Sequence, residues 1–128
     1  MMYFLSAEAL IMRLPWRSLK LKEISYMHSE AYAAGELKHG TISLIEDGIW
    51  TIGIATQGSL FEKLISNMVE VKSRGANILG ITSYGNYSME DTADCTIYVP
   101  KTLECFYPSL VVIPLQLLAY YVSLSKGL

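Results

Sequence analysis

Three side chains near the start of the chain can transfer a proton or contact a substrate. Glu23 carries a carboxylate, which acts as a general base when its surroundings position it. His39 carries an imidazole, which titrates near neutral pH and can pass a proton in either direction. Lys20 precedes Glu23 by three residues, a helical spacing at which its ammonium can orient the carboxylate or touch a substrate. The alternative from the residues alone is an exposed Glu23–Lys20 ion pair and a surface histidine.

Other polar residues give weaker signals. The polar run 83–86 (SYGN) follows a predicted strand at the end where open α/β sheets bind ligands, although an ordinary polar loop is the favoured interpretation. His28 is interpreted as structural, and Cys95 and Cys105 as reduced, partly buried thiols. The sequence contains no Walker motif, dinucleotide-binding glycine pattern or metal-ligand cluster, so we expect no metal and no cofactor.

The elements that must position these residues follow an α/β pattern. Near-continuous apolar runs predict buried parallel strands at 49–56, 77–83 and 94–99, with a further short strand at 3–5. Ser59 and Glu62 form a predicted capping box for a helix that ends at Gly75. Helical spacing also predicts helices at 18–27, 33–45 and 109–125. Together these elements predict a three-layer α/β/α sandwich with a short parallel sheet.

Composition restricts the classes of function. The chain has 128 residues, enough for one small domain, and a formal net charge of −2, which argues against nucleic acid as a partner. Hydrophobic residues make up 52% and charged residues only 17%, so we expect another chain or another domain to cover part of the surface, and we expect a homodimer. The uncharged stretch 109–125 is shorter than the ~20 residues of a membrane span and contains Pro114, which favours a buried helix and no membrane.

One block of sequence is specific enough to resemble a known family. Residues 20–40 read KLKEISYMHSEAYAAGELKHG, residues 62–82 read EKLISNMVEVKSRGANILGIT, and residues 111–128 read VVIPLQLLAYYVSLSKGL. These segments resemble the isomerase half of the glutamine–fructose-6-phosphate aminotransferase family, whose two sugar isomerase (SIS) subdomains share one fold. The chain looks like the second subdomain from about residue 18 onward, and residues 1–128 are expected to form that single subdomain.

The resemblance implies a function and roles for the candidate residues. The family converts fructose 6-phosphate and glutamine to glucosamine 6-phosphate in the cytoplasm, as a dimer. Its isomerase glutamate corresponds to Glu23. Its ring-opening histidine, which acts in the neighbouring subunit's site, corresponds to His39. Lys20 is a lower-ranked substrate contact, and Thr41 stands where the family commonly has proline.

The chain also departs from the family. Residues 6–17 (SAEALIMRLPWR) differ from the family pattern G-R-G-x-x-Y-x-x-A-x-E-G, which two compensating frameshifts in the encoding DNA would explain. The glutaminase domain, the first SIS subdomain and the tail lysine that forms a Schiff base have no counterpart in the 128 residues, so we expect an enzyme fragment that is inactive alone. The alternative is a non-catalytic SIS module that binds a phosphosugar or mediates dimerisation.

Overall fold

Five parallel strands form the centre of the molecule. The structure is a computed structural model that describes residues 2–6, 22–33, 36, 40–56 and 58–128. The strands are β1 (Met2–Ser6), β2 (Ser29–Ala33), β3 (Trp50–Ala55), β4 (Asn77–Ser83) and β5 (Cys95–Val99), in the spatial order β2-β1-β3-β4-β5. The four strands predicted from the sequence are confirmed, and β2 is an additional edge strand that the sequence analysis missed.

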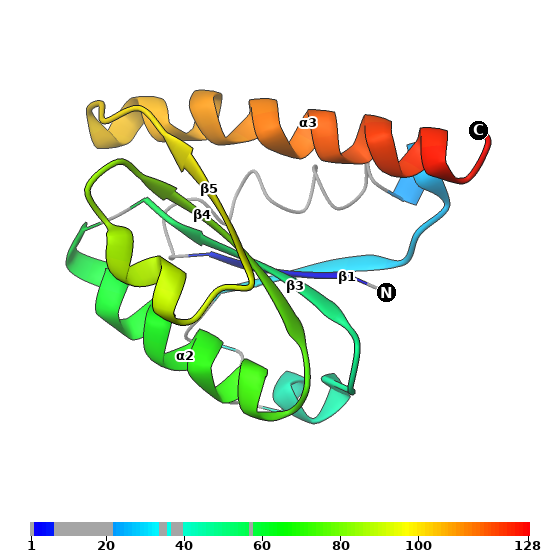
Figure 1. Cartoon of the computed structure of the whole chain (residues 1–128), viewed down its shortest axis with the longest axis horizontal. Coiled ribbons are helices and arrows are strands. Elements are labelled where there is room, and N and C mark those ends of the chain that lie inside the picture. The colour runs from blue at the N-terminus through cyan, green and yellow to red at the C-terminus, as the bar shows by residue number, and fades with distance from the viewer. Residues whose placement is uncertain (1, 7–21, 34–35, 37–39, 57) are drawn as a thin grey trace.

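Helices cover both faces of this sheet, as Figure 1 shows. Helix α2 (Phe61–Ser73) and the short helix η5 (Tyr87–Asp91) lie on one face, and α3 (Tyr107–Ser125) lies on the other. Further 3-10 turns are η3 (Thr41–Leu44), η4 (Gly58–Leu60) and η6 (Glu104–Phe106). The predicted three-layer α/β/α sandwich is therefore confirmed.

Each face of the sheet has its own hydrophobic core. The core under α2 contains the helix residues Leu64, Met68 and Val71 against strand residues such as Ile78. The core under α3 contains Ile52, Ile54 and Ile81 of the central strands, which pack against Val111, Leu115 and Ala119 and against Met2. Because β3 and β4 are covered on both sides, their sequences are apolar almost throughout.

Two glycines in adjacent strands make room for the first of these cores. Gly53 of β3 and Gly80 of β4 are register partners. A Cβ atom on Gly53 would lie 2.4 Å from the sulfur of Met68, and one on Gly80 would lie 2.6 Å from the sulfur of Met89. The bare backbone at the middle of the sheet thus accommodates two methionine side chains that a larger residue would displace.

The secondary structure predicted from the sequence between β1 and β3 was partly wrong. The described residues of the predicted helix over 33–45 contradict a continuous helix: Ala33 is the last residue of β2, and residues 41–44 adopt a 3-10 turn. Gly40, with φ of 125°, precedes that turn in a conformation that no α-helix contains. Of the predicted helix at 18–27, the described residues 22–25 are helical and Tyr26, with φ of 52°, ends them.

Two smaller expectations also fail. Helix α2 begins at Phe61, after η4, and has no side-chain cap, so the predicted capping box of Ser59 and Glu62 does not form. Cys95 and Cys105 are free but exposed instead of partly buried.

Helix α3 is buried along one side only. Tyr107, Val111, Leu115, Ala119 and Ser123, spaced four residues apart, are its buried residues. Counted together with η6, residues 104–125 are the one helix in the described part of the chain that is long and apolar enough to cross a membrane, a property that helices of soluble proteins share.

Candidate functional site

Hydroxyl and amide groups gather where β3 and β4 end. Thr82 Oγ1 donates a 2.7 Å hydrogen bond to the carbonyl oxygen of Ala55, which ties the two strand ends together. Asn86 Nδ2 donates to Thr82 Oγ1 at 3.1 Å and to Ser83 Oγ at 3.0 Å. The polar run 83–86 thus contributes Ser83 and Asn86 to a network at the edge where ligands of open α/β sheets bind.

Thr56 is the unusual member of this edge. It follows the last residue of β3, its side chain is only 5% exposed, and its Oγ1 has no hydrogen-bond partner among the described residues. A buried hydroxyl without a partner costs about 1–3 kcal/mol, and a polar ligand atom would offset that cost. Sequence analysis missed Thr56 because its burial, which the sequence does not display, is what distinguishes it from other threonines.

Three tyrosines lie beside this edge. Tyr84 follows β4, Tyr87 belongs to η5, and Tyr98 belongs to β5. The ring of Tyr98 stacks on Tyr84 and meets Tyr87 edge-on, with centroids 5.6 Å apart in both pairs. Tyr98 donates a 2.5 Å hydrogen bond to Glu90 Oε1, and this bond is the main reason why the pKa of Tyr98 is raised to about 12.

The Tyr98 contact predicts a pH effect. Because the folded-state pKa of about 12 lies above the ordinary tyrosine value, Tyr98 stabilises the fold fully below the unfolded pKa of ~10 and loses that contribution as pH rises toward 12. The ultraviolet difference titration between the wild type and Tyr98→Phe isolates this group. Glu90→Gln is expected to return its pKa toward ~10, whereas Asp91→Asn, a neighbouring carboxyl change, leaves it raised. An unchanged titration in Glu90→Gln would contradict the contact.

Glu23 lies where the strands begin, on the side of the sheet opposite to the strand ends that carry Thr56 and Ser83. Ile24 and Ser25, which follow it, accept hydrogen bonds through their carbonyl oxygens from Ser123 Oγ at 3.2 Å and Lys126 Nζ at 3.0 Å. These donors belong to the C-terminal end of α3, beside which the helical residues 22–25 lie in Figure 1. Because ligands of open α/β sheets bind where the strands end, a catalytic Glu23 is predicted at the C-terminal edge of the strands. This prediction is wrong, because the segment of Glu23 leads into the first residue of β2.

The structure thus separates the candidates. Glu23 is exposed at the edge where the strands begin, while Thr56 and Ser83 lie where β3 and β4 end. Lys20 and His39 are outside the described residues, so their predicted roles remain predictions. Within the described segments no three His, Cys, Asp or Glu side chains come together as ligands for a metal ion.

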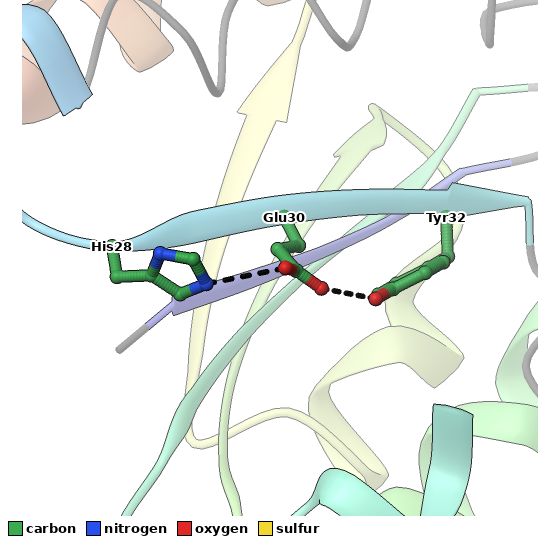
Figure 2. Close-up of polar contacts among 3 residues, drawn as sticks. All are labelled: His28, Glu30 and Tyr32. Carbon is green, nitrogen blue, oxygen red and sulfur yellow. Dashed lines mark hydrogen bonds and ion pairs between the residues drawn. The ribbon is translucent and has the colours of Figure 1, made fainter. Parts of the chain in front are cut away.

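Three polar side chains along β2 form a chain of hydrogen bonds that the sequence analysis did not predict. His28 Nε2 lies 3.2 Å from Glu30 Oε1, and the Tyr32 hydroxyl donates to Glu30 Oε2, so the three side chains share one face of the edge strand (Figure 2). The bond from Tyr32, followed by the contacts with His28, lowers the pKa of the Glu30 carboxyl. The alternation in SEAYA was the available sequence signal. The contact with Glu30 agrees with the structural role expected for His28.

Comparisons with known proteins agree with this fold. A family model described as the SIS domain matches residues 18–126. The glutamine–fructose-6-phosphate aminotransferase [isomerizing] of Caldanaerobacter subterraneus subsp. tengcongensis is 56% identical over 110 residues, and that of Clostridium tetani is 60% identical over 110 residues. Each alignment covers 86% of this chain and 18% of the relative, so the chain spans less than a fifth of the length of these curated relatives.

Solved structures show the same likeness. The C-terminal domain of glucosamine-fructose-6-phosphate aminotransferase from Francisella tularensis superposes with a TM-score of 0.87 at 31% identity, over 98% of this chain and 36% of that one. The tagatose-6-phosphate ketose/aldose isomerase from Escherichia coli superposes with a TM-score of 0.84 at 15% identity, over 98% of this chain and 36% of that one, which reflects the fold alone.

Proposed function

Because the chain belongs to the SIS domain family, we propose that it is the second sugar-isomerase subdomain of a glutamine–fructose-6-phosphate aminotransferase. In this proposal it acts on a sugar phosphate, fructose 6-phosphate or glucosamine 6-phosphate, in the cytoplasm and as part of a homodimer. It is inactive alone, because ammonia supply, the phosphate cradle and the Schiff-base lysine come from other parts of the enzyme. The observation that carries the proposal is the 54–60% identity over 110 to 112 residues with several such enzymes.

Each candidate residue has a role in this reaction. Isomerisation moves a proton between the first two carbons of the open-chain sugar, and Glu23 takes and returns it. His39 opens the sugar ring by shuttling a proton between the ring oxygen and the anomeric hydroxyl. Lys20 orients Glu23 or contacts the substrate.

The position of Glu23 supports a shared site. Its carboxylate is exposed at the edge where the strands begin, next to the C-terminal end of α3, and it carries out chemistry only if a second body supplies the remaining walls. A general base in a half-open site is not held against a substrate, so the isolated chain loses the positioning on which the reaction depends.

The second candidate function is a non-catalytic module that binds a phosphosugar. The buried, unpartnered hydroxyl of Thr56 beside Ser83 and Asn86 favours it, since these groups can hydrogen-bond a sugar or phosphate oxygen without any part for Glu23. The two functions differ in whether the chain supports turnover when the rest of the enzyme is present.

A chimera separates the two. The 110 residues of the Caldanaerobacter relative that align with this chain are replaced by the matching residues of this chain. We expect the chimera to make glucosamine 6-phosphate from fructose 6-phosphate and glutamine, and the purified isolated chain to make none. A folded chimera that binds fructose 6-phosphate but forms no product would contradict the enzymatic proposal and support the binding module.

A further inference from the structure

The helical residues that carry Glu23 end beside α3. Residues 22–25 are helical, Tyr26 N donates a 3.0 Å hydrogen bond to the Lys22 carbonyl, and Tyr26 itself has a φ of 52°. A residue with positive φ is a common way to end a helix, and a helix leaves its last carbonyl groups without partners of its own. The orientation of this last turn therefore depends on which groups donate hydrogen bonds to those carbonyls.

The donors to two of these carbonyl groups belong to the C-terminal end of α3. Lys126 Nζ donates to the Ser25 carbonyl at 3.0 Å, and Ser123 Oγ lies 3.2 Å from the Ile24 carbonyl. The serine hydroxyl has a single hydrogen, which it shares with the Ala119 carbonyl at 2.9 Å, whereas the lysine bond is charge-assisted. A cation at the C-terminal end of a helix also faces the negative end of the helix dipole. Lys126 is therefore the stronger of the two ties.

The end of α3 that supplies these donors is itself fixed. Gly127 N donates to the Leu124 carbonyl and Leu128 N to the Ser123 carbonyl, both at 3.0 Å. Together with the φ of 75° at Gly127, these bonds form a Schellman motif in which Lys126 is the C-cap residue. Ser123 also ends the buried side of α3, whose apolar members pack on the central strands. The backbone that carries Lys126 is thus held against the core of the molecule.

The two sides of the turn at 22–25 have different surroundings. Ser25 is 0% exposed, and Met27, just after the turn, packs against the core under α3. Glu23, by contrast, is exposed. Residues two apart in a helix are rotated by about 200°, so Glu23 and Ser25 lie on nearly opposite sides of the turn. The end of α3 therefore contacts one side of the turn and leaves the side that carries Glu23 exposed.

We propose that Lys126, assisted by Ser123, is a positioning residue for Glu23. The inference rests on the proposed function, in which Glu23 is the general base. Transfer of a proton requires the carboxylate to lie within hydrogen-bond reach of the reacting group, and a displacement of ~1 Å can cost about 10²-fold in rate. Lys126 holds the backbone two residues after Glu23 and so sets where the carboxylate lies. Its loss should lower kcat without changing the pH dependence of kcat.

The first test is the activity of a chimera whose exchanged segment includes residues 18–126. With the protein folded by circular dichroism, Lys126→Met should lower kcat about 5- to 50-fold and leave KM nearly unchanged. Lys126→Arg keeps the charge and the N–H donors and should recover most of the rate. Lys63→Met, at an exposed position of α2, should stay within about two-fold of the wild type.

Two results of this assay would overturn the proposal. The first is an unchanged kcat in Lys126→Met. The second is a raised KM with an unchanged kcat, which would make Lys126 a substrate contact. Ser123→Ala removes the weaker tie and should lower kcat about 2- to 5-fold, and it gives the same comparison if the methionine variant does not fold.

The second test measures the tie without turnover. In the whole chain, Lys126→Met should speed hydrogen exchange of the Tyr26 amide about 3- to 10-fold, because the turn that this amide closes opens more often. The amide of Leu64, in the middle of α2, should exchange as in the wild type. Exchange of the Tyr26 amide at the wild-type rate would overturn the tie. A wild-type chimera without activity contradicts the proposed function, whereas an active chimera that is insensitive to Lys126→Met contradicts only this inference.

Discussion

In the active chimera, Glu23→Gln is expected to lower kcat about 10²- to 10⁴-fold, the usual contribution of a general base. Glutamine keeps the size and most of the hydrogen bonding of glutamate but cannot take up the proton. Since the substrate is still held by other groups, KM should change little. The measurement is the rate of glucosamine 6-phosphate formation over a range of fructose 6-phosphate concentrations.

The matched control for this experiment is Glu62→Gln. Glu62 lies in the first turn of α2, on the other face of the sheet from the end of α3 beside which Glu23 is placed. The same chemical change there should leave kcat within about two-fold, since an exposed carboxylate in a first helical turn contributes only ~0.3–1 kcal/mol to stability. A Glu23→Gln chimera as active as the control would make Glu23 a surface residue and remove it from the proposed site.

Leu64→Ala is expected to lower the free energy of unfolding by about 2–5 kcal/mol. Leu64 is 1% exposed at the contact between α2 and the sheet, where it belongs to the core that also contains Met68 and Ile78. Its truncation leaves a cavity that the tightly packed methionines over Gly53 and Gly80 cannot fully close. Urea denaturation followed by circular dichroism measures the change.

Val69→Ala on the same helix is the control for this loss. Val69 is 53% exposed, and alanine favours the helix, so the free energy of unfolding should change by less than ~0.5 kcal/mol. Equal losses in the two variants would mean that α2 is not packed on the sheet as described. Both measurements belong at one protein concentration, because a dimer makes stability depend on concentration.

Two of the strands that the sequence predicted, β3 and β4, share one physical property. β3 and β4 are covered by α2 on one face and α3 on the other, so burial on both sides leaves a continuous apolar run that is legible without a structure. β2 lies at the edge of the sheet, and one of its faces carries the half-buried polar ladder of His28, Glu30 and Tyr32. Such a short mixed strand resembles a helix or a loop in the sequence.

Other errors arose where the tertiary context overrides local spacing. The apolar positions of 33–45 recur at helical intervals. Ala33 nevertheless pairs with β1 as a strand residue, and the positive φ of Gly40 is incompatible with an α-helix.

Glu23, Ser83 and Asn86 could be found as candidates from the sequence, whereas Thr56 could not, because its burial distinguishes it. The sequence could not predict that these candidates lie at opposite edges of the sheet. That separation depends on the path of the chain from residues 22–25 to the start of β2.

The hydrogen bonds between α3 and residues 24–25 bear on how the chain is made. β1 is the first strand of this sheet to be synthesised, and it occupies an inner position in the sheet. The core around Met2 of β1 is complete only when α3 has packed against it. Ser123 and Lys126 then join carbonyl groups about a hundred residues earlier. Contacts of such long sequence separation slow folding and cannot form while the C-terminal helix is still inside the ribosome. Until then, β1 and the apolar face of β3 have no cover. Chaperones that bind nascent apolar segments therefore have their longest opportunity at β1 and β3.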